Sequence, residues 1–378
     1  MTMFEKELRR LEKDNLLRRL IARGSPQGPV VTIGGKRYIN FSSNDYLGLA
    51  GHPELLKAAA AAGKRFGFGS GASRLLAGGS SIHERLEETT AAFKGTEAAV
   101  VFNSGYAANT GIIPSLATES SVIFSDELNH ASIIDGCRLS SARVVVYTHG
   151  DKGHLEALMK KERARKKIVA TDSVFSMDGD IAPLPDIHSL CRKYKAVLYI
   201  DDAHGTGVLG NGRGALVHFG LTAEPWVVQM GTFSKALGSF GAFAAGSRDI
   251  IDWLTNTARG FMFSTALPAP VAAASMKALA LIKERKGLLR KLWSNRKMLA
   301  DGLRQIGYDE RPSETPIITI KPGTVKETIA LSEYLWGKGI FVPAIRPPTV
   351  REPRVRIAVT AAHSERHLCL LIDALNKF

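Results

Sequence analysis

The sequence contains little cysteine and no long uninterrupted apolar segment. Its three cysteines, Cys137, Cys191 and Cys369, share no spacing typical of metal ligands or of a disulfide framework. The longest apolar stretch, 266–276, contains two prolines and a serine and is too short to cross a bilayer. The first residues are charged and lack the apolar segment of a signal peptide. We therefore expect a cytoplasmic protein with reduced thiols and no membrane span.

Common nucleotide and hydrolase motifs are also missing. The sequence has no Walker A motif and no GxSxG motif. Gly205, Gly207 and Gly210 have the spacing of a dinucleotide-binding turn, but Gly212 and Gly214 follow and prevent the helix that such a turn requires. We interpret these glycines as a loop.

The charge balance is strongly basic, with a formal net charge of +14. The basic residues are spread along the chain and no nucleic-acid motif accompanies them, so we expect no nucleic-acid partner. The densest basic cluster lies at 160–167. We interpret it as a solvated helix face. The alternative is a landing surface for a phosphorylated substrate or an acidic carrier protein.

From about residue 52, short apolar strands alternate with helical segments. Nearly continuous apolar strands separated by helices indicate a sheet that is buried on both faces and largely parallel. The sequence therefore predicts an α/β fold with helices on both faces of a central sheet. The expected strands are 98–102, 121–124, 143–147, 168–171, 196–200, 225–230 and 242–245.

The two ends of the chain have different patterns. The first twenty or so residues have the apolar spacing of a basic amphipathic helix, and Gly34-Gly35 marks a hairpin between 30–33 and 37–40. Beyond about residue 265 we expect a small α+β domain with a long helix through 277–305, strands at 316–320 and 354–359, and helices at 326–338 and from 364. The expected domains are an arm at 1–50, a large domain at 51–270 and a small domain at 271–378.

Polar residues follow several of the expected strands. In open α/β sheets, ligands bind beyond the carboxyl ends of the strands, so these residues should meet on one rim. Asp201, Asp202 and His204 could form a metal site with Asp126 and His130, but a buried lysine beside a dication argues against it. The residues that follow the strands are Asn103 to Tyr106, Asp126, His130, Asp172, Ser176, Asp201, Asp202, His204, Thr232, Ser234 and Lys235.

Lys235 is the only charged residue between Glu224 and Arg248. A lysine in a neutral, apolar and glycine-containing window should be buried, and burial lowers the pKa of the amine. A neutral amine at the end of a buried strand can form a Schiff base with a carbonyl. The alternative is a structural lysine whose ammonium group reaches the surface. The polar rim favours the reactive amine.

Two helix starts are visible in the sequence. Gly105 precedes an expected helix whose free N–H groups and dipole can bind a phosphate, although an ordinary strand–helix turn has the same pattern. Ser81 and Glu84 have the spacing of a capping box, with Ser81 as N-cap. We therefore expect His83 on the helix surface.

Together these parts are those that pyridoxal phosphate requires. A lysine binds the cofactor covalently, and an aspartate pairs with the pyridinium nitrogen so that the ring can accept electrons. One imidazole can stack on the ring, a second can bond the phenolate oxygen, and a helix start with hydroxyl groups can hold the phosphate. No metal is expected.

Several stretches resemble the α-oxoamine synthases, a family of pyridoxal-phosphate-dependent transferases of fold type I. The resemblance covers nearly the whole chain, and DDAHGTG with TFSKALGS is specific for the superfamily. The stretches are FSSNDYLGL (41–49), GSGASRLLAGGSSIHERLE (69–87), FNSGYAAN (102–109), FSMDGD (175–180), DDAHGTG (201–207), TFSKALGSFG (232–241), AIRPPTV (344–350) and RVRIAVTAAH (354–363).

The resemblance implies a role for each matching residue. Lys235 would hold the cofactor and move protons, Asp201 would pair with the pyridine nitrogen, and His130 would stack on the ring. The cofactor's phenolate side would contact His204 and Ser176, and its phosphate would contact Gly105, Tyr106 and Thr232, with Ser264 or Thr265 from a partner subunit. The substrates would contact Arg356 and Asn44 (amino-acid carboxylate) and Arg18 and Thr349 (acyl group). Asp172 stands where several relatives have glutamate, so its role stays open.

The resemblance also implies a reaction. GSGASRL and AIRPPTV are similar to the branch of the family that serves biotin biosynthesis. That branch condenses L-alanine with a pimeloyl thioester, on coenzyme A or on an acyl carrier protein, and releases carbon dioxide. The alternative is a relative that uses glycine or serine, such as a glycine C-acetyltransferase. The resemblance further implies a homodimer with its active site at the subunit interface.

Overall fold

The computed structural model of the protein describes residues 2–308 and 313–378. The chain forms two compact units. The larger unit contains residues 49–176 and 181–289, and the smaller contains residues 1–48, 177–180 and 290–378. Throughout the described residues, no helix combines the length and the apolar character needed to cross a membrane.

The larger unit is built on a seven-stranded sheet with the order β3-β9-β8-β7-β6-β4-β5. All neighbours from β8 to β5 run parallel, and β9 is antiparallel to both β3 and β8. This confirms the largely parallel sheet, and β3 and β5 have the expected bounds. The strands are β3 (Ala98–Phe102), β4 (Ser121–Asp126), β5 (Arg143–Tyr147), β6 (Lys166–Asp172), β7 (Val197–Asp201), β8 (Val227–Thr232) and β9 (Ala242–Gly246).

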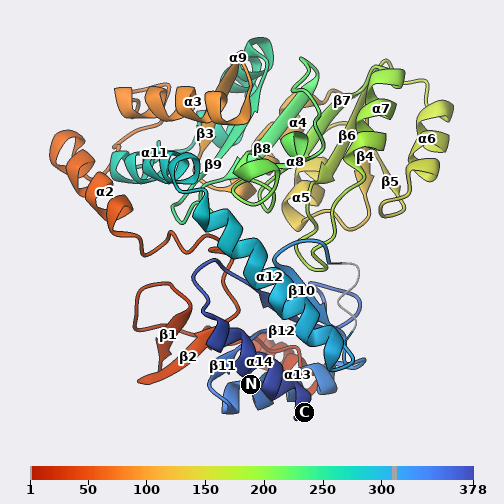
Figure 1. The fold of residues 1–378 in the computed structure, drawn as a ribbon. Coiled ribbons are helices and arrows are strands. Elements are labelled where there is room, and N and C mark those ends of the chain that lie inside the picture. The colour runs from red at the N-terminus through yellow and green to blue at the C-terminus, as the bar shows by residue number, and fades with distance from the viewer. Residues whose placement is uncertain (1, 309–312) are drawn as a thin grey trace. The chain divides into compact units, whose positions relative to one another are not determined.

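Helices cover both faces of this sheet (Figure 1). Those between β3 and β8 connect successive strands of the sheet, as parallel pairing requires. The helices are α2 (Pro53–Phe66), α3 (Ser81–Lys94), α4 (Gly105–Leu116), α5 (Ala131–Leu139), α6 (Lys152–Lys161), α7 (Leu184–Tyr194), α8 (Ala215–His218), α9 (Arg248–Thr257), α10 (Arg259–Met262) and α11 (Ala269–Glu284), with a 3-10 turn at Gly210–Gly212.

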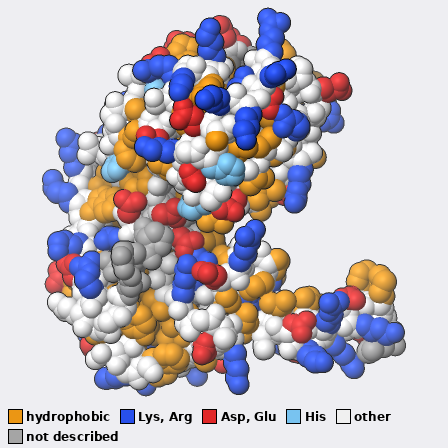
Figure 2. All heavy atoms as spheres, turned by 90° about the vertical axis from the view of Figure 1, so that its right-hand side faces the viewer, with side chains coloured by type: hydrophobic (Ala, Val, Ile, Leu, Met, Phe, Trp, Pro, Cys, Tyr) orange, Lys and Arg blue, Asp and Glu red, His pale blue; other side chains and the backbone are white. Residues whose placement is uncertain are grey.

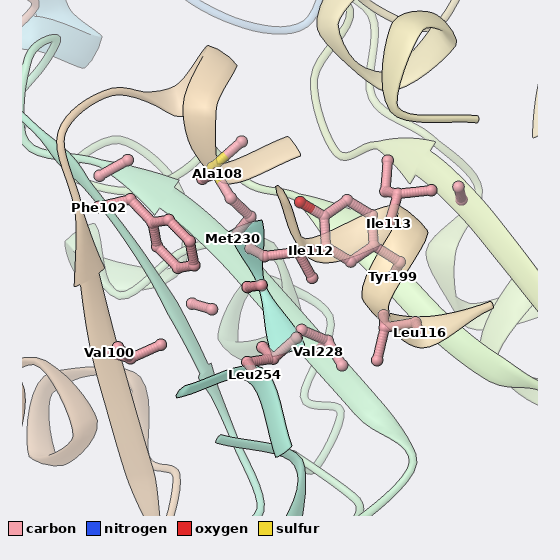
Figure 3. Packing of buried hydrophobic residues seen from close by; sticks show 14 of the residues in the cluster. Val100, Phe102, Ala108, Ile112, Ile113, Leu116, Tyr199, Val228, Met230 and Leu254 are labelled. Atoms are coloured by element: carbon pink, nitrogen blue, oxygen red, sulfur yellow. The ribbon is translucent and has the colours of Figure 1, made fainter. Parts of the chain in front are cut away.

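A hydrophobic core lies between this sheet and the helices α4 and α9. Val100 and Phe102 of β3 and Met230 of β8 lie near one another with Ile112 of α4 and Leu254 of α9 (Figure 3). All five are at most 3% exposed. Burial of such side chains contributes about 1.5–3 kcal/mol each, so the core fixes where the strand ends of the larger unit lie.

The smaller unit contains two three-stranded sheets. In one, β1 (Val30–Ile33) and β2 (Lys36–Asn40) form the expected hairpin, and β11 (Ile340–Phe341) pairs parallel to β2. The other has the order β10 (Ile317–Ile320), β13 (Arg354–Ala358) and β12 (Ala344–Ile345). Its helices are α1 (Met3–Lys13), α12 (Gly287–Gln305, of which the smaller unit contains the part from Arg290), α13 (Val325–Gly337) and α14 (Glu365–Asn376).

Two helix expectations were wrong. The N-terminal helix does not continue to about residue 20, because its C-cap is Asp14 and Asn15 adopts a left-handed conformation with φ of 56°. The expected long helix through 277–305 is two helices, since α11 has its C-cap at Arg285 and α12 begins at Gly287. Glycine is a poor helix interior residue, which favours a break at this position.

The expected position of His83 on a helix surface was also wrong. The N-cap of α3 is Ser80 rather than Ser81, and His83 completes its capping box in place of a glutamate. His83 is 1% exposed, and its Nε2 lies 2.6 Å from the carbonyl oxygen of Leu267. The imidazole is held inside the protein between Ser80 and Leu267, because its Nδ1 also lies 2.9 Å from Ser80 Oγ.

Basic side chains are distributed over the surface (Figure 2). The 160–167 cluster does not form one helix face, because α6 ends at Lys161 and Lys166 and Lys167 begin β6. Lys160, Lys161 and the loop residues between these elements include the exposed members of the cluster. The cluster therefore lies at the amino end of β6.

Candidate active site in the larger unit

Lys235 lies in the connection between β8 and β9, directly beyond the carboxyl end of β8. The turn is closed by the bonds from the N–H of Gly238 to the carbonyl of Lys235 (2.9 Å) and from the N–H of Phe233 to the carbonyl of Gly241 (2.9 Å). The side chain of Lys235 is half-buried. Gly238 has φ of 62°, and a Cβ there would lie 2.3 Å from the backbone nitrogen of Ala50. Only glycine allows this close approach, which fixes the position of the lysine.

Asp201 ends β7 and is 4% exposed. Its Oδ2 accepts a hydrogen bond from Asn109 Nδ2 at 2.7 Å, and its Oδ1 accepts one from the N–H of Ala203 at 3.0 Å. No lysine or arginine within residues 2–308 and 313–378 forms an ion pair with it. A buried carboxylate with neutral donors alone is complementary to a cationic ligand group, such as a protonated ring nitrogen.

His130 is the N-cap of α5 and keeps an exposed imidazole face. Its backbone N–H donates to Asp172 Oδ2 at 2.7 Å, and its Nδ1 lies 2.7 Å from Ser132 Oγ. Partial burial lowers the pKa of His130, the negative charge of Asp201 opposes this, and the positive charge of Lys235 adds to it. Lys235, Asp201 and His130 are therefore close enough to interact electrostatically.

Asp172 pairs directly with Asp201 in the ladder between β6 and β7. Burial raises the pKa of Asp172 well above its ordinary value, and the negative charge of Asp201 adds to this effect. Two neighbouring carboxyl groups do not both ionise readily, which favours the neutral form of Asp172. Its side chain accepts a hydrogen bond from the backbone N–H of His130 and so helps to fix the position of that residue.

The amino end of α4 offers an anion site. The N-cap Ser104 accepts from the N–H of Ala107, and its carbonyl accepts from the N–H of Ala108. Among the described residues, no acceptor bonds the N–H groups of Gly105 and Tyr106. Unsatisfied N–H groups at the positive end of a helix dipole are a binding site for a phosphate.

Two hydroxyl groups lie at the end of β8. Thr232 Oγ1 donates to the carbonyl of Gly241 at 2.8 Å, and Ser234 Oγ lies 2.6 Å from Thr232 Oγ1. Since the proton of Thr232 is committed to Gly241, Ser234 donates to Thr232. Ser234 is the exposed hydroxyl of this pair.

The remaining expected cofactor residues of the larger unit lie after β6, after β7, on α4 and after α10. His204 is buried and Ser176 half-buried, and both belong to the segments that follow β7 and β6. The hydroxyl of Tyr106 donates to Asp135 on α5. Ser264 and Thr265 follow α10, where the carbonyl of Thr265 accepts from Asn103 Nδ2 at 2.8 Å.

Asp202, directly after Asp201, serves a different purpose. Its Oδ2 lies 2.7 Å from Nζ of Lys94, and its Oδ1 accepts from Ser173 Oγ at 2.7 Å. Nowhere in residues 2–308 and 313–378 do three histidine, cysteine, aspartate or glutamate side chains form a group able to hold a metal ion. The metal site considered from the sequence has no such ligand group.

The four expected substrate residues belong to the smaller unit. Arg356 on β13 is 5% exposed, and its Nη2 donates to Asn44 Oδ1 at 3.0 Å. Arg18 Nη2 donates to the carbonyl of Pro347 at 2.9 Å and lies 3.5 Å from Thr349 Oγ1. Each pair is assembled by residues more than 300 positions apart in the sequence.

Three buried residues beside the site were missed by the sequence reasoning. Asn109, Ser132 and Tyr199 are each at most 1% exposed. Asn109 and Ser132 link Asp201 to His130 through hydrogen bonds, and Tyr199 donates to Asn109. Asn109 lies within the FNSGYAAN stretch and faces the core side of α4. A polar residue at a buried helix position beside an expected site was the signal that could have identified it.

Comparisons with known proteins show the family of this chain. Residues 36–375 match the aminotransferase class I and II family. The 8-amino-7-oxononanoate synthase of Thermoanaerobacter pseudethanolicus is 47% identical over 99% of this chain and 95% of its own length.

Solved structures of two related enzymes have a similar fold. A serine palmitoyltransferase variant from S. paucimobilis, with a bound PLP–myriocin aldimine, has a TM-score of 0.93 and 27% identity over 99% of this chain and 96% of its own. The 8-amino-7-oxononanoate synthase of Francisella tularensis has a TM-score of 0.78 and 26% identity over 90% of this chain and 97% of its own.

Proposed function

The chain belongs to the aminotransferase class I and II family, and we propose that it is a pyridoxal-phosphate-dependent 8-amino-7-oxononanoate synthase of biotin biosynthesis. It condenses L-alanine with a pimeloyl thioester and releases 8-amino-7-oxononanoate, carbon dioxide and the free thiol. Support comes from relatives of that name that match nearly the whole chain. The thiol is coenzyme A or an acyl carrier protein.

The observation that carries the proposal is the arrangement of Lys235, Asp201 and His130 beside the amino end of α4. Asp201 has no cationic partner among the described side chains, His130 has an exposed face, and Gly105 and Tyr106 have N–H groups to donate. These are the complements of a pyridinium nitrogen, an aromatic ring and a phosphate. The residues of this structure therefore fit pyridoxal phosphate.

When bound, the cofactor withdraws electrons from the substrate Cα, which makes that carbon acidic and then nucleophilic. Asp201 would lie against the ring nitrogen and favour its protonated form. Lys235 would hold the cofactor through its Nζ, and its free amine would take the proton from the substrate Cα as general base and later return a proton to the same carbon.

Further residues hold the ring and the phosphate. His130 would lie against the ring face, while His204 and Ser176 would bond the phenolate oxygen. Gly105 and Tyr106 would bind the phosphate through their N–H groups, and Thr232 would join them once its hydroxyl turns from the carbonyl of Gly241. Holding these groups in place excludes water and orients the substrate Cα toward Lys235.

The smaller unit recognises the substrates. Arg356 binds the carboxylate of alanine through its planar guanidinium group, whose orientation Asn44 fixes by its hydrogen bond. Arg18 and Thr349 bind the acyl substrate. The basic character of the chain favours the approach of anionic thioesters.

We further propose a cytoplasmic homodimer with its active sites at the interface. Apolar side chains are exposed around the segments that carry Tyr106, Ser264 and Thr265: Phe68 is 84% and Phe263 is 69% exposed. Exposed apolar side chains of this size gather at protein interfaces. Ser264 or Thr265 of a second copy would then complete the phosphate site.

The test is a product assay with purified protein and pyridoxal phosphate. L-alanine with pimeloyl-CoA should give 8-amino-7-oxononanoate by mass spectrometry, and loss of carboxyl label from alanine should match it mole for mole. Glycine with acetyl-CoA serves as the comparison. Turnover with the second pair alone would keep the cofactor chemistry and overturn the substrate assignment.

A further inference from the structure

Asn109 lies at the centre of a buried hydrogen-bond chain that no expected role included. Its Nδ2 lies 2.7 Å from Asp201 Oδ2 and 2.7 Å from Ser132 Oγ, and its Oδ1 accepts from the hydroxyl of Tyr199. Ser132 Oγ in turn lies 2.7 Å from His130 Nδ1. The chain therefore connects Asp201 with His130, the two residues proposed to hold the cofactor ring.

The direction of every bond in this chain follows from donor and acceptor chemistry. The amide nitrogen of Asn109 faces both the carboxylate oxygen of Asp201 and the hydroxyl of Ser132, so both amide hydrogens are used, one on each. Burial raises the pKa of Tyr199 well above its usual value, so its hydroxyl stays protonated and donates to Oδ1 of Asn109.

The same logic fixes the proton of His130. Ser132 Oγ accepts from Asn109 and keeps its own hydrogen, which can donate to His130 Nδ1. The backbone N–H of Ser132 also points at Nδ1, at 3.3 Å. Nδ1 therefore receives hydrogen bonds, and in the neutral imidazole the proton must be on Nε2.

From this chain the structure assigns Asn109 as a positioning residue that couples Asp201 to His130 and holds His130 as the neutral Nε2–H tautomer. Asn109 orients the carboxylate of Asp201 with one amide hydrogen. With the other it sets the direction of the Ser132 hydroxyl, and so the tautomer of the ring. Its effect on the cofactor depends on the function proposed above, whereas the tautomer is a property of the chain alone.

The chain predicts different consequences for its two inner members. Ser132→Ala removes the hydroxyl donor to His130 but leaves the bond between Asn109 and Asp201. Asn109→Ala removes both. The preference of His130 for the Nε2–H tautomer should therefore weaken in both variants. The affinity for pyridoxal phosphate should fall about 10-fold in Asn109→Ala only, because that is the usual effect of losing a hydrogen bond to a charged group.

The experiment is nitrogen NMR of the histidine side chains in the full-length protein, without cofactor and at a pH where His130 is neutral. His130→Gln identifies the signal. The wild type should show a protonated Nε2 and an unprotonated Nδ1, and Ser132→Ala should move the Nδ1 signal toward the protonated range. Cofactor affinity is then measured by fluorescence titration of the same samples.

Asn295→Ala is the matched control. Asn295 is also a 1% exposed asparagine, and it donates to the carbonyls of Thr360 and His363 in the smaller unit. The Asn295→Ala variant should lose about as much stability as Asn109→Ala without changing the His130 signals. A wild-type proton on Nδ1, or an Asn109→Ala variant that matches the control in both readouts, would overturn the assignment.

The outcomes separate this inference from the proposed function. If Asn109→Ala does not fold, the wild-type and Ser132→Ala spectra still decide the tautomer. A protein that shows the Nε2–H tautomer and makes no 8-amino-7-oxononanoate would refute the function and leave the hydrogen-bond chain standing. A protein that makes the product and has the His130 proton on Nδ1 would refute the role of the hydrogen-bond chain and leave the proposed function standing.

Discussion

Lys94 Nζ lies 2.7 Å from Asp202 Oδ2, and both side chains are almost completely buried. The ammonium group also donates to the carbonyl of Arg213 at 2.7 Å and lies 3.3 Å from Thr206 Oγ1. Asp202 thus has a cationic partner within the protein, whereas the preceding Asp201 has neutral donors alone among the described residues. The ion pair with Lys94 therefore gives Asp202 a structural role, whereas the carboxylate of Asp201 belongs to the candidate site.

Replacing Lys94 by methionine should destabilise the protein by about 3–5 kcal/mol, because it leaves the charge of Asp202 buried without a partner. The loss is measured by urea unfolding. Adding Asp202→Asn to Lys94→Met should recover part of it. If the two effects simply add, the pair is not coupled as the distances indicate.

Lys235→Ala should abolish turnover and keep the fold. The amine acts on the substrate proton, and general base catalysis contributes about 10²–10⁴-fold in rate, while the turn is held by backbone bonds that alanine retains. Product formation and circular dichroism are measured together. Lys152→Ala, at an exposed lysine, is the control, and normal activity in Lys235→Ala would exclude the Schiff-base role.

Arg356→Lys should raise the KM for L-alanine about 10-fold and affect kcat less. A lysine keeps the charge but loses the planar fork that binds a carboxylate with two bonds. Steady-state kinetics at varied alanine concentration measures the change. Arg296→Lys, where the arginine donates to the carbonyls of Ser313 and Thr315, is the control. An unchanged KM in Arg356→Lys would remove Arg356 from the alanine site.

His363 should make the protein sensitive to acid. Burial lowers its pKa from 6.5 to about 4, and its Nδ1 accepts from the N–H of Thr360 at 3.0 Å. Because the unfolded chain binds the proton more tightly, this stability is present above about pH 6.5 and is lost as the pH falls to about 4. The loss is about 3 kcal/mol, since one pKa unit corresponds to about 1.4 kcal/mol.

The measurement is urea unfolding of the wild type and of His363→Gln between pH 4 and pH 7. The glutamine does not titrate, so the free-energy difference between the two proteins should shrink as the pH falls. A difference that stays constant across this range would mean that the pKa of His363 is the same in the folded and unfolded states, and would contradict the lowered value.

Charge reversal at Lys160 and Lys161 should leave the rate with a carrier-bound thioester unchanged. The cluster lies at the amino end of β6, and Asp172 at its other end is about 20 Å away, given about 3.3 Å per residue. The rate with pimeloyl-acyl carrier protein is measured at several salt concentrations. A lower rate with weaker salt dependence would restore the alternative of a carrier surface.

Much of the larger unit could be predicted from the sequence by local rules. Apolar strands of five to seven residues, such as β3 and β6, form the buried sheet, and the carboxyl ends of parallel strands meet on one edge. Chain order and strand direction alone therefore place Lys235, Asp201 and His130 near one another. The charge-free window around Lys235 is likewise visible without a structure.

Only the tertiary structure shows the contacts between residues that are far apart in the sequence. The sequence DDAH does not show which aspartate is neutralised, because Lys94 is more than 100 positions away from Asp202. It does not show that Asn109 joins Asp201 to His130, since this requires α4 to pack over the strand ends. The sequence does not show that His83 is buried against Leu267, which is 184 positions away. Local patterns fix elements and their order, whereas hydrogen-bond partners depend on packing between residues far apart in the chain.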